Sequence, residues 1–542
     1  MNELTNSETV KRISREIIDY LMIHPNFPRQ KITNLKGKFG KKYNYHKVIK
    51  NAQILHHATE EELGVIIQLL KRRITRSISG VSVIAIMTKP LPCPGNCVYC
   101  PGQDSQPDQK VAQSYTGREP AAMRSIHNNY DSYEQVQSRI KDLEAIGHNV
   151  DKIDLVCMGG TFLSSPIDYQ EEFIRGAYEG VVERRAANLE EIKRIAENSK
   201  RRLIGLTIET RPDYCTEPYV DMMLNYGTTR VEIGIQTVLD EIYKIVNRGH
   251  TSQDSINAIR IAKDAGLKIN THIMPNLPGS DCSKDLEMFE HLFSSQDYRP
   301  DMLKIYPCVV IKGTKLYDWW RAGEFTPYSI NELVDLLANV KQQIPSYMRI
   351  QRIMRDIPAD LIEAGCKKSN LRQLVHKRLE ELNLKCNCIR CREYGIAKKS
   401  VAIDENKFED IKLYRYDYDA SNGQEIFLSY ENKKEDYLVA YLRLRKPSEY
   451  AHRHELNDGK TMVVREVKVV GELVPTDKKP NRKTQLQHRG FGKLLMENAE
   501  KIALEDFNSK KLAVISGIGV RDWFYELGYT LDGNYVSKPL ID

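Results

Sequence analysis

The sequence predicts an α/β multidomain protein with a basic helical N-terminal segment, a partial or complete β/α barrel and a C-terminal α+β domain. The chain has 542 residues, whereas a single hydrophobic core rarely serves more than about 250 to 300 residues. Its composition, 41% hydrophobic and 28% charged, is typical of globular proteins. Strand and helix patterns alternate through the middle of the chain, and strand patterns dominate near its end. We therefore expect four regions: 1–75, 76–370, 371–400 and 401–542.

The first region is predicted to be helical and to bind a polyanion. Apolar residues recur at helical spacing in 9–24, and the lysine-rich stretch 31–50 contains Phe39, Tyr43 and Tyr45. Residues 1–80 hold fifteen Lys and Arg against seven Asp and Glu, a balance of +8, while the whole chain carries +7. Such asymmetry and the interleaved aromatics favour nucleic acid. The alternative is a solvated surface. The predicted binding residues are Lys71, Arg72, Arg73 and Arg76.

The second region alternates short β-branched runs with helical segments. Six runs are predicted to be strands: 81–88, 152–159, 203–210, 229–237, 267–275 and 302–310. Amphipathic helices are predicted between them, for example at 133–147, 189–199 and 252–266. Strands alternating with helices indicate βα units around a parallel sheet. In a β/α barrel the chemistry lies at the C-terminal ends of the strands.

Three cysteines follow the first predicted strand. Cys93, Cys97 and Cys100 have the spacing Cys-x3-Cys-x2-Cys. Eleven cysteines in 542 residues are too few for a disulfide scaffold, and clustered thiolates favour a soft metal centre. A zinc knuckle is the alternative, but the cluster stands where a barrel keeps its catalytic centre.

This motif resembles that of the radical S-adenosylmethionine (SAM) enzymes. The resemblance implies that the three cysteines bind three irons of a [4Fe–4S] cluster and that the fourth iron binds SAM. One electron then cleaves SAM to a 5′-deoxyadenosyl radical, so the cofactors carry the hard chemistry. Later strand ends also carry polar groups or glycines, His272 among them. The implied SAM-binding residues are Gly159, Gly160, Thr161, Glu209, Arg211 and Gln236.

The last region is predicted to be an antiparallel sheet with one clear helix. Strands are expected at 425–432, 437–446 and 463–474, and a glycine-containing turn at 487–492 opens the helix. Backbone N–H groups at a helix start can bind a pyrophosphate. The turn resembles the acetyl-CoA site of GNAT-type N-acetyltransferases, as does the closing segment 516–529. The predicted apolar stripe of the helix is Leu494, Leu495, Ala499, Ile502 and Ala503.

The two domains, taken in this order, resemble those of the family of the catalytic subunit of Elongator. Colinear segments carry the resemblance, among them SISGVSVIAIMTKP, QSYTGREPAAMRS, LTIETRPDYC and QHRGFGKLLMENAE. The family implies conversion of tRNA uridine 34 to 5-carboxymethyluridine: the radical takes hydrogen from the acetyl methyl of acetyl-CoA, the carbon adds to C5, and the thioester is hydrolysed. The implied acetyl-CoA contacts are Lys152, Glu466, Val467, Lys468, Val469, Phe491, Gly492, Lys493 and Phe524.

Two of these contacts raise questions. The resemblance makes Lys152 catalytic, yet Lys152 opens a strand about 23 Å from Gly159 at 3.3 Å per residue. Barrel chemistry belongs at the far end of that strand. Phe524 stands where the family usually has a tyrosine, and it lacks the hydroxyl that would protonate a leaving thiolate.

Four further cysteines permit a tetrahedral structural zinc that ties the third region to the barrel. They are Cys308, Cys386, Cys388 and Cys391. Free thiols are the alternative. The remaining cysteines have no partner spacing and are expected to be ordinary buried thiols.

The implied partners are tRNA with U34, an external electron donor and further Elongator-like subunits. No apolar run reaches the 18 residues of a membrane span and the N-terminus has no signal-peptide pattern, so we expect a cytoplasmic protein without a membrane partner. Two other functions stay open. One is a protein lysine acetyltransferase with a structural iron–sulfur barrel, and the other is a non-catalytic tRNA-binding scaffold.

Overall fold

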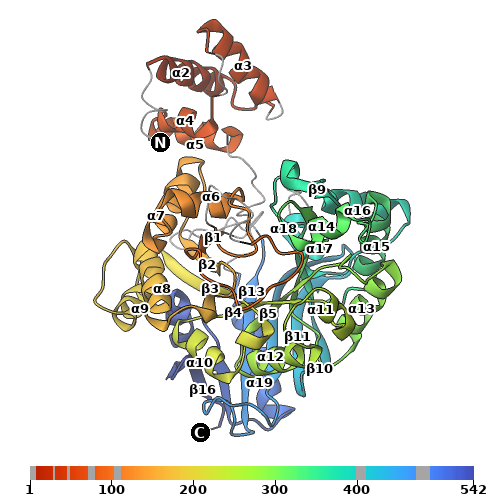
Figure 1. The fold of residues 1–542 in the computed structure, drawn as a ribbon. Coiled ribbons are helices and arrows are strands. Elements are labelled where there is room, and N and C mark those ends of the chain that lie inside the picture. The colour runs from red at the N-terminus through yellow and green to blue at the C-terminus, as the bar shows by residue number, and fades with distance from the viewer. Residues whose placement is uncertain are drawn as a thin grey trace. The chain divides into compact units, whose positions relative to one another are not determined.

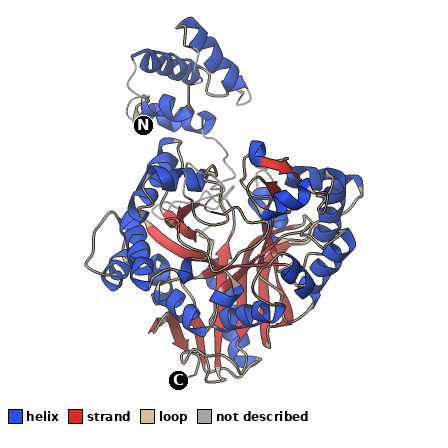
Figure 2. Ribbon diagram, in the orientation of Figure 1, coloured by secondary structure: helices blue, strands red, loops and turns tan. Residues whose placement is uncertain are grey.

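The computed structural model describes residues 8–28, 31–45, 49–70, 80–102, 111–397, 410–471 and 489–541 (Figures 1 and 2). The chain forms two compact units. One comprises residues 1–82 and 137–151, and the other comprises residues 83–136 and 152–542. No helix in the described part of the chain is long and apolar enough to cross a membrane.

The first unit contains a small helical core. Its helices before residue 82 are α2 (Glu8–Ile23), α3 (Ile32–Lys42), α4 (Asn51–His56) and α5 (Glu60–Leu70). Phe39, Tyr43 and Tyr45 pack, partly buried, against the apolar faces of these helices. The aromatic rings that we predicted among the lysines as a nucleic-acid surface therefore serve the core. The lysines of the same stretch stay outside, because Lys38 and Lys41 are exposed.

The second unit opens with a seven-stranded sheet in the order β1-β2-β3-β4-β5-β6-β8. Its pairs from β2 to β8 are parallel, and β1 and β8 form its two edges, so the curled sheet is an open barrel. The strands are β1 (Val81–Met87), β2 (Lys152–Met158), β3 (Arg202–Thr210), β4 (Arg230–Gln236), β5 (Lys268–Ile273), β6 (Met302–Ile305) and β8 (Arg349–Ile353).

Five of the six predicted strands are confirmed over most of their length, the sixth (302–310) is confirmed only over Met302–Ile305, and β8 was missed. Its sequence, RIQRI, is short and places two arginines among its five residues, so its hydrophobic signal is weak. It is a strand because β6 pairs with it from Met302 onward. Two further short strands form a separate antiparallel ladder: β7 (Val310–Ile311) and β9 (Ile362–Ala364).

Helices connect the strands of this sheet and follow it in the chain. They are α6 (Pro120–His127), α7 (Ser132–Ala145), α8 (Ile167–Val182), α9 (Leu189–Glu197), α10 (Glu217–Asn225), α11 (Asp240–Ile245), α12 (Ser252–Asp264), α13 (Cys282–Ser294), α14 (Lys315–Arg321), α15 (Ile330–Gln343), α16 (Leu371–Glu381), α17 (Ile389–Arg392) and α18 (Tyr394–Ala397). The three helices predicted from periodicity correspond to α7, α9 and α12. Single-turn 3₁₀ segments lie at 162–164, 212–214, 359–361 and 518–520.

A second seven-stranded sheet forms the C-terminal part, in the order β10-β11-β12-β13-β14-β16-β15. It is antiparallel except for the pair β13–β14. Helix α19 (Phe491–Glu505) buries Leu495, Met496, Ala499 and Ala503 against it. Leu494, predicted in the buried stripe, is instead 41% exposed. The remaining elements are β10 (Lys412–Ala420), β11 (Gly423–Asn432), β12 (Tyr437–Lys446), β13 (Thr461–Val469), β14 (Lys511–Val514), α20 (Arg521–Tyr525), β15 (Thr530–Asp532) and β16 (Tyr535–Pro539).

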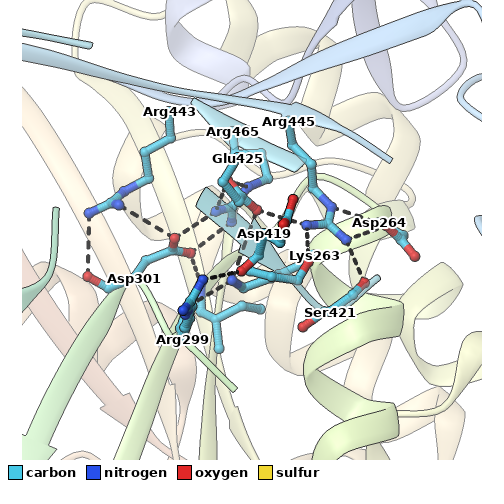
Figure 3. A network of polar contacts seen from close by, with 12 residues as sticks. Lys263, Asp264, Arg299, Asp301, Asp419, Ser421, Glu425, Arg443, Arg445 and Arg465 are labelled. Carbon is cyan, nitrogen blue, oxygen red and sulfur yellow. Dashed lines mark hydrogen bonds and ion pairs between the residues drawn. The ribbon is translucent and has the colours of Figure 1, made fainter. Parts of the chain in front are cut away.

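The C-terminal sheet packs on the N-terminal ends of the barrel strands. Arg465 of β13 donates to the carbonyl of Leu267, just before β5, and pairs with Asp301, just before β6. A Cβ on Gly517 would lie 2.1 Å from the carbonyl oxygen of Ile204 near the start of β3. Figure 3 shows the buried arginines and carboxylates that join the two parts. The barrel therefore has a base covered by the second sheet and a mouth at its other end.

Candidate functional site

The three-cysteine loop lies directly after β1, at the mouth of the barrel. Cys93, Cys97 and Cys100 are free thiols and are partly exposed. Thr161 Oγ1 lies 3.7 Å from the Sγ of Cys93, and Ser114 Oγ lies 3.1 Å from the Sγ of Cys100. Three thiols at one barrel end, not joined by disulfides, suit the ligation of an iron–sulfur cluster.

The loop after β2 places two glycines at the mouth of the barrel, next to the three-cysteine loop. Gly159 has φ +127° and Gly160 has φ +64°, values that favour glycine. A Cβ at Gly159 would lie 2.3 Å from the hydroxyl oxygen of Thr88, so only glycine fits there. Thr161 follows and contacts Cys93. The Gly-Gly-Thr turn predicted to bind SAM therefore adjoins the cysteine loop.

Two more predicted SAM-binding residues keep buried polar atoms available. Arg211 Nη1 and Gln236 Oε1 are buried and make no hydrogen bond within the described residues. Gln236 also has φ +69°. Buried polar atoms are almost always hydrogen-bonded in folded proteins. A donor and an acceptor left over beside three thiols fit a site built for a polar ligand.

A buried ion cluster lies beneath these residues. The Lys304 ammonium lies 3.3 Å from Glu209 and contacts Glu232, and His272 Nε2 lies 3.0 Å from Glu232. Tyr115 donates its hydroxyl to Glu209. Burial alone would raise the pKa of Glu232, but Lys304 holds it well below its usual value. Tyr115 and Lys304 both contact Glu209 and thereby orient its carboxylate.

Two groups of the predicted acetyl-CoA residues, 466–469 and 491–493, meet at the end of β13. The parallel ladder between β13 and β14 covers only 461–464, so 466–469 lie beyond it. Helix α19 begins beside them: a Cβ on Gly492 would lie 3.8 Å from Val469 and 3.3 Å from Trp523. The backbone N–H groups at the start of α19 are thus available to an anion.

Phe524 does not reach this site. It is 3% exposed and packs in the core beneath α19, because α20 turns Trp523 toward Gly492 instead. The neighbouring Tyr525 donates its hydroxyl to Glu197 at 2.6 Å. Burial and that carboxylate raise the pKa of Tyr525 to about 12. Sequence comparison alone could not distinguish which of these rings lines the site.

Comparisons with known proteins agree with this geometry. Residues 92–291 match the Radical SAM superfamily and residues 300–381 match the Radical_SAM C-terminal domain. A tRNA uridine(34) acetyltransferase of Methanocaldococcus infernus is 48% identical over 90% of this chain and 91% of its own length. Elongator complex protein 3 of Saccharomyces cerevisiae is 42% identical over 94% of this chain and 92% of its own length.

The chain belongs to the Elongator complex protein 3 family. The human member is 40% identical over 94% of this chain and 93% of its own length. The solved structure of the archaeal Methanocaldococcus infernus Elp3 with an N-terminal deletion superposes with a TM-score of 0.75 and 44% identity. It covers 85% of this chain and 100% of that chain. The predicted family is therefore confirmed.

Two lysines of this family member lie at the base of the barrel. Lys152 is the first residue of β2, opposite Arg202, so the strand does not start later. Lys268 opens β5 opposite Arg230 and is half-buried. Burial lowers the pKa of Lys268 to about 8, although Glu466 of β13 counteracts it. Because the C-terminal sheet covers the base, both lysines lie at the end of the barrel that faces that sheet.

Three of the four cysteines predicted to bind zinc come together beside α17. The ligand atoms of Cys386, Cys388 and Cys391 lie within 4.8 Å of one another. Cys308 is not with them: it packs in an apolar cluster with Val98 and Phe325 of the barrel mouth. The predicted four-cysteine set is wrong in that residue, because the strand end that carries Cys308 lies away from the base.

A histidine that the sequence analysis did not single out lies beside one of these cysteines. His376 of α16 lies 3.9 Å, through Nε2, from the Sγ of Cys391. Burial lowers the pKa of His376 to about 4, which keeps the imidazole neutral. The group of ligand atoms that lie within 4.8 Å of one another contains the three thiols and not His376, so a structural zinc would need a fourth ligand beside them. Only the spacing Cys-x-Cys-x2-Cys, which lacks an obvious fourth member, hinted at such a residue.

Some predicted residues lie outside the described part of the chain. These are the basic residues Lys71, Arg72, Arg73 and Arg76, and also Gln487 and His488 of the predicted glycine turn. The turn is described from Arg489 onward, and Gly490 caps α19 with φ +87°.

Proposed function

We propose that the protein converts uridine 34 of tRNA to 5-carboxymethyluridine, using SAM and acetyl-CoA. One observation carries the proposal: a single compact unit joins a three-cysteine loop at the mouth of a barrel to a helix-start anion site on a sheet that covers its base. The name of the relative from Methanocaldococcus infernus, tRNA uridine(34) acetyltransferase, supports the substrate.

The mouth of the barrel would bind the cluster and SAM. Cys93, Cys97 and Cys100 would bind a [4Fe–4S] cluster, which supplies a 5′-deoxyadenosyl radical from SAM. The SAM site would be formed by the Gly-Gly-Thr turn together with Arg211 and Gln236, whose spare buried atoms support the assignment. Glu209, oriented by its two partners, would complete it.

The C-terminal sheet would bind acetyl-CoA. The N–H groups of Phe491, Gly492 and Lys493 would bind its pyrophosphate at the helix start. Residues 466–469 would pair with its extended chain, since they lie beyond the β14 ladder. Phe524 would contribute only by supporting Trp523 from the core.

A lysine at the base of the barrel would act on the thioester of acetyl-CoA. We keep Lys152 in that role by resemblance, and the geometry adds Lys268 as a second candidate. The pKa of Lys268 is lowered to about 8, which still leaves the ammonium as the main form at neutral pH. Either ammonium could polarise the thioester carbonyl. Comparing Lys152→Ala with Lys268→Ala would separate them.

The first unit would bind the tRNA backbone. Its described surface carries exposed lysines on and around α3, among them Lys31, Lys38 and Lys41, and the predicted residues Lys71, Arg72, Arg73 and Arg76 extend the same charge. Affinity for tRNA should fall steeply with salt, with a log–log slope of about −0.7 to −0.9 per phosphate contact. An external low-potential electron donor and further Elongator-like subunits are the other proposed partners.

One experiment tests the function as a whole. The full chain, reconstituted anaerobically with iron and sulfide, is incubated with tRNA, SAM, acetyl-CoA and a one-electron reductant, and the digested tRNA is examined by mass spectrometry. We expect 5-carboxymethyluridine, together with 5′-deoxyadenosine. Acetylated protein lysines without modified uridine would favour the lysine acetyltransferase. Bound but unmodified tRNA would favour a scaffold.

A further inference from the structure

Arg248 lies in the turn after α11 and points into the cysteine loop. It is 7% exposed, and its Nη1 donates to the Sγ of Cys97 at 3.4 Å. Its Nη2 donates to the carbonyl of Gly234 on β4. The guanidinium therefore bridges the barrel wall and one of the three thiols at the mouth.

The turn that carries Arg248 is fastened to the cysteine loop at three successive positions. Residues 246–248 face residues 96–98, so the arginine is held in register with Cys97. The contacts are Val98 N–H to the Val246 carbonyl at 3.1 Å, Asn247 Nδ2 to the Asn96 carbonyl at 2.9 Å and Arg248 Nη1 to Cys97 Sγ. Arg211 Nη2 donates to the Arg248 carbonyl at 2.9 Å and secures the turn from its other side.

Arg248 has no acidic partner in the described part of the chain. Burial would lower the pKa of Arg248, but Tyr99 and Cys97 raise it above its usual value, and its Nε makes no hydrogen bond to the described residues. A buried cation without a counter-charge costs several kcal/mol. A cluster bound by thiolates would supply the missing negative charge at Cys97.

We propose that Arg248 is a positioning residue that raises the reduction potential of the iron–sulfur cluster by hydrogen-bonding Cys97 and placing a cation beside it. The inference rests on the proposed cluster. One electron from a low-potential donor converts a [4Fe–4S]²⁺ cluster to the 1+ state, which adds one negative charge. A fixed cation and a hydrogen bond to a ligating sulfur stabilise the state with more negative charge.

The test is a redox titration of the reconstituted full chain without SAM, followed by the electron paramagnetic resonance signal of the reduced cluster. Arg248→Gln should lower the midpoint potential enough to reduce the reduced-to-oxidised ratio at a given potential about tenfold, which is about 59 mV for a one-electron couple. Arg248→Lys, which keeps the charge and loses the planar geometry, should fall between. Arg194→Gln removes the same charge from an exposed site on α9 and should leave the midpoint unchanged.

Iron content separates the outcomes. An Arg248→Gln protein with about four irons and a wild-type midpoint would overturn the proposal. If that variant binds no iron, Arg248→Lys decides: a lowered midpoint supports the proposal, and a wild-type midpoint overturns it. Loss of iron from both variants with unchanged circular dichroism would also overturn it, because Arg248 would then only build the loop. A wild-type chain that binds no iron would refute the cluster itself.

Discussion

Buried arginines at the two ends of the barrel differ in their partners: those of the base pair with carboxylates, whereas Arg248 at the mouth contacts a thiol and has no carboxylate partner among the described residues. At the base, Arg445 and Arg465 use every guanidinium nitrogen: Arg445 binds Asp264 and Glu425, and Arg465 binds Asp301 and Glu425 (Figure 3). At the mouth, the Nε of Arg248 and the Nη1 of Arg211 make no hydrogen bond to the described residues.

This difference in arginine partners suits a structural contact at the base and a binding site at the mouth. Several carboxylates neutralise the base arginines, and breaking such a network leaves uncompensated buried charge. The mouth keeps polar atoms that the protein itself does not satisfy, beside three free thiols. The mouth therefore has the thiols and the unpaired positive charge that the proposed cluster would use, whereas the paired charges of the base join the two sheets.

The largest expected effect is at the mouth. Cys97→Ala should abolish cluster binding, from about four irons per chain to near zero, and with it the production of 5′-deoxyadenosine. The base should be unaffected, so far-UV circular dichroism should not change. Cys282→Ser, which alters a half-buried thiol on α13, should retain the iron. Full deoxyadenosine production by Cys97→Ala would refute the radical assignment.

The next effect concerns the three cysteines beside α17. If the predicted structural zinc binds there, Cys388→Ser should lose one equivalent of it, because the variant removes one of the three clustered thiols. Cys308→Ser should keep that zinc, since Cys308 packs at the mouth. Elemental analysis of protein purified without chelators would measure both. Zinc that is unchanged in both variants would return Cys386, Cys388 and Cys391 to the free-thiol interpretation, and zinc lost from both would restore Cys308 to the set.

The base network should contribute a large part of the stability. Arg465→Ala leaves Asp301 and Glu425 buried without this partner, and we expect a loss of about 3 to 5 kcal/mol in the free energy of unfolding. Arg415→Ala is the matched control, because Arg415 pairs with Asp417 and Asp506 on the exposed edge of the same sheet and should cost less than about 1 kcal/mol. Guanidinium denaturation of the two proteins would give the comparison, and equal losses would contradict it.

The smallest effect depends on pH. The pKa of Lys268 is lowered to about 8 in the folded state, against about 10.4 in an unfolded chain. Between these values the unfolded chain binds more protons, so this lysine makes the folded state more stable as pH rises. The wild type should therefore gain up to about 3 kcal/mol over Lys268→Met between pH 8 and 10. Parallel stability curves for the two proteins would mean that Lys268 is not desolvated.

Much of the fold and of the mouth could be predicted from local pattern. The six strands and the helices α7, α9 and α12 follow from periodicity that each segment carries by itself. The motif Cys-x3-Cys-x2-Cys after β1 needs only its spacing and its place in the chain. Strand β8 was missed because RIQRI has little hydrophobic signal, and a strand of that kind exists only through its neighbour β6.

The sequence by itself determined the order of the elements, the family and the three-cysteine motif at the mouth, because short-range spacing encodes them. Tertiary structure decided the rest. It separated Cys308 from the cysteines beside α17, buried Phe524, and turned the aromatic rings of α3 and its loop into a core. It also placed Arg248 against Cys97, 151 positions away in the chain. The physical reason is that burial and pairing across such separations depend on packing between distant elements, which no local pattern records.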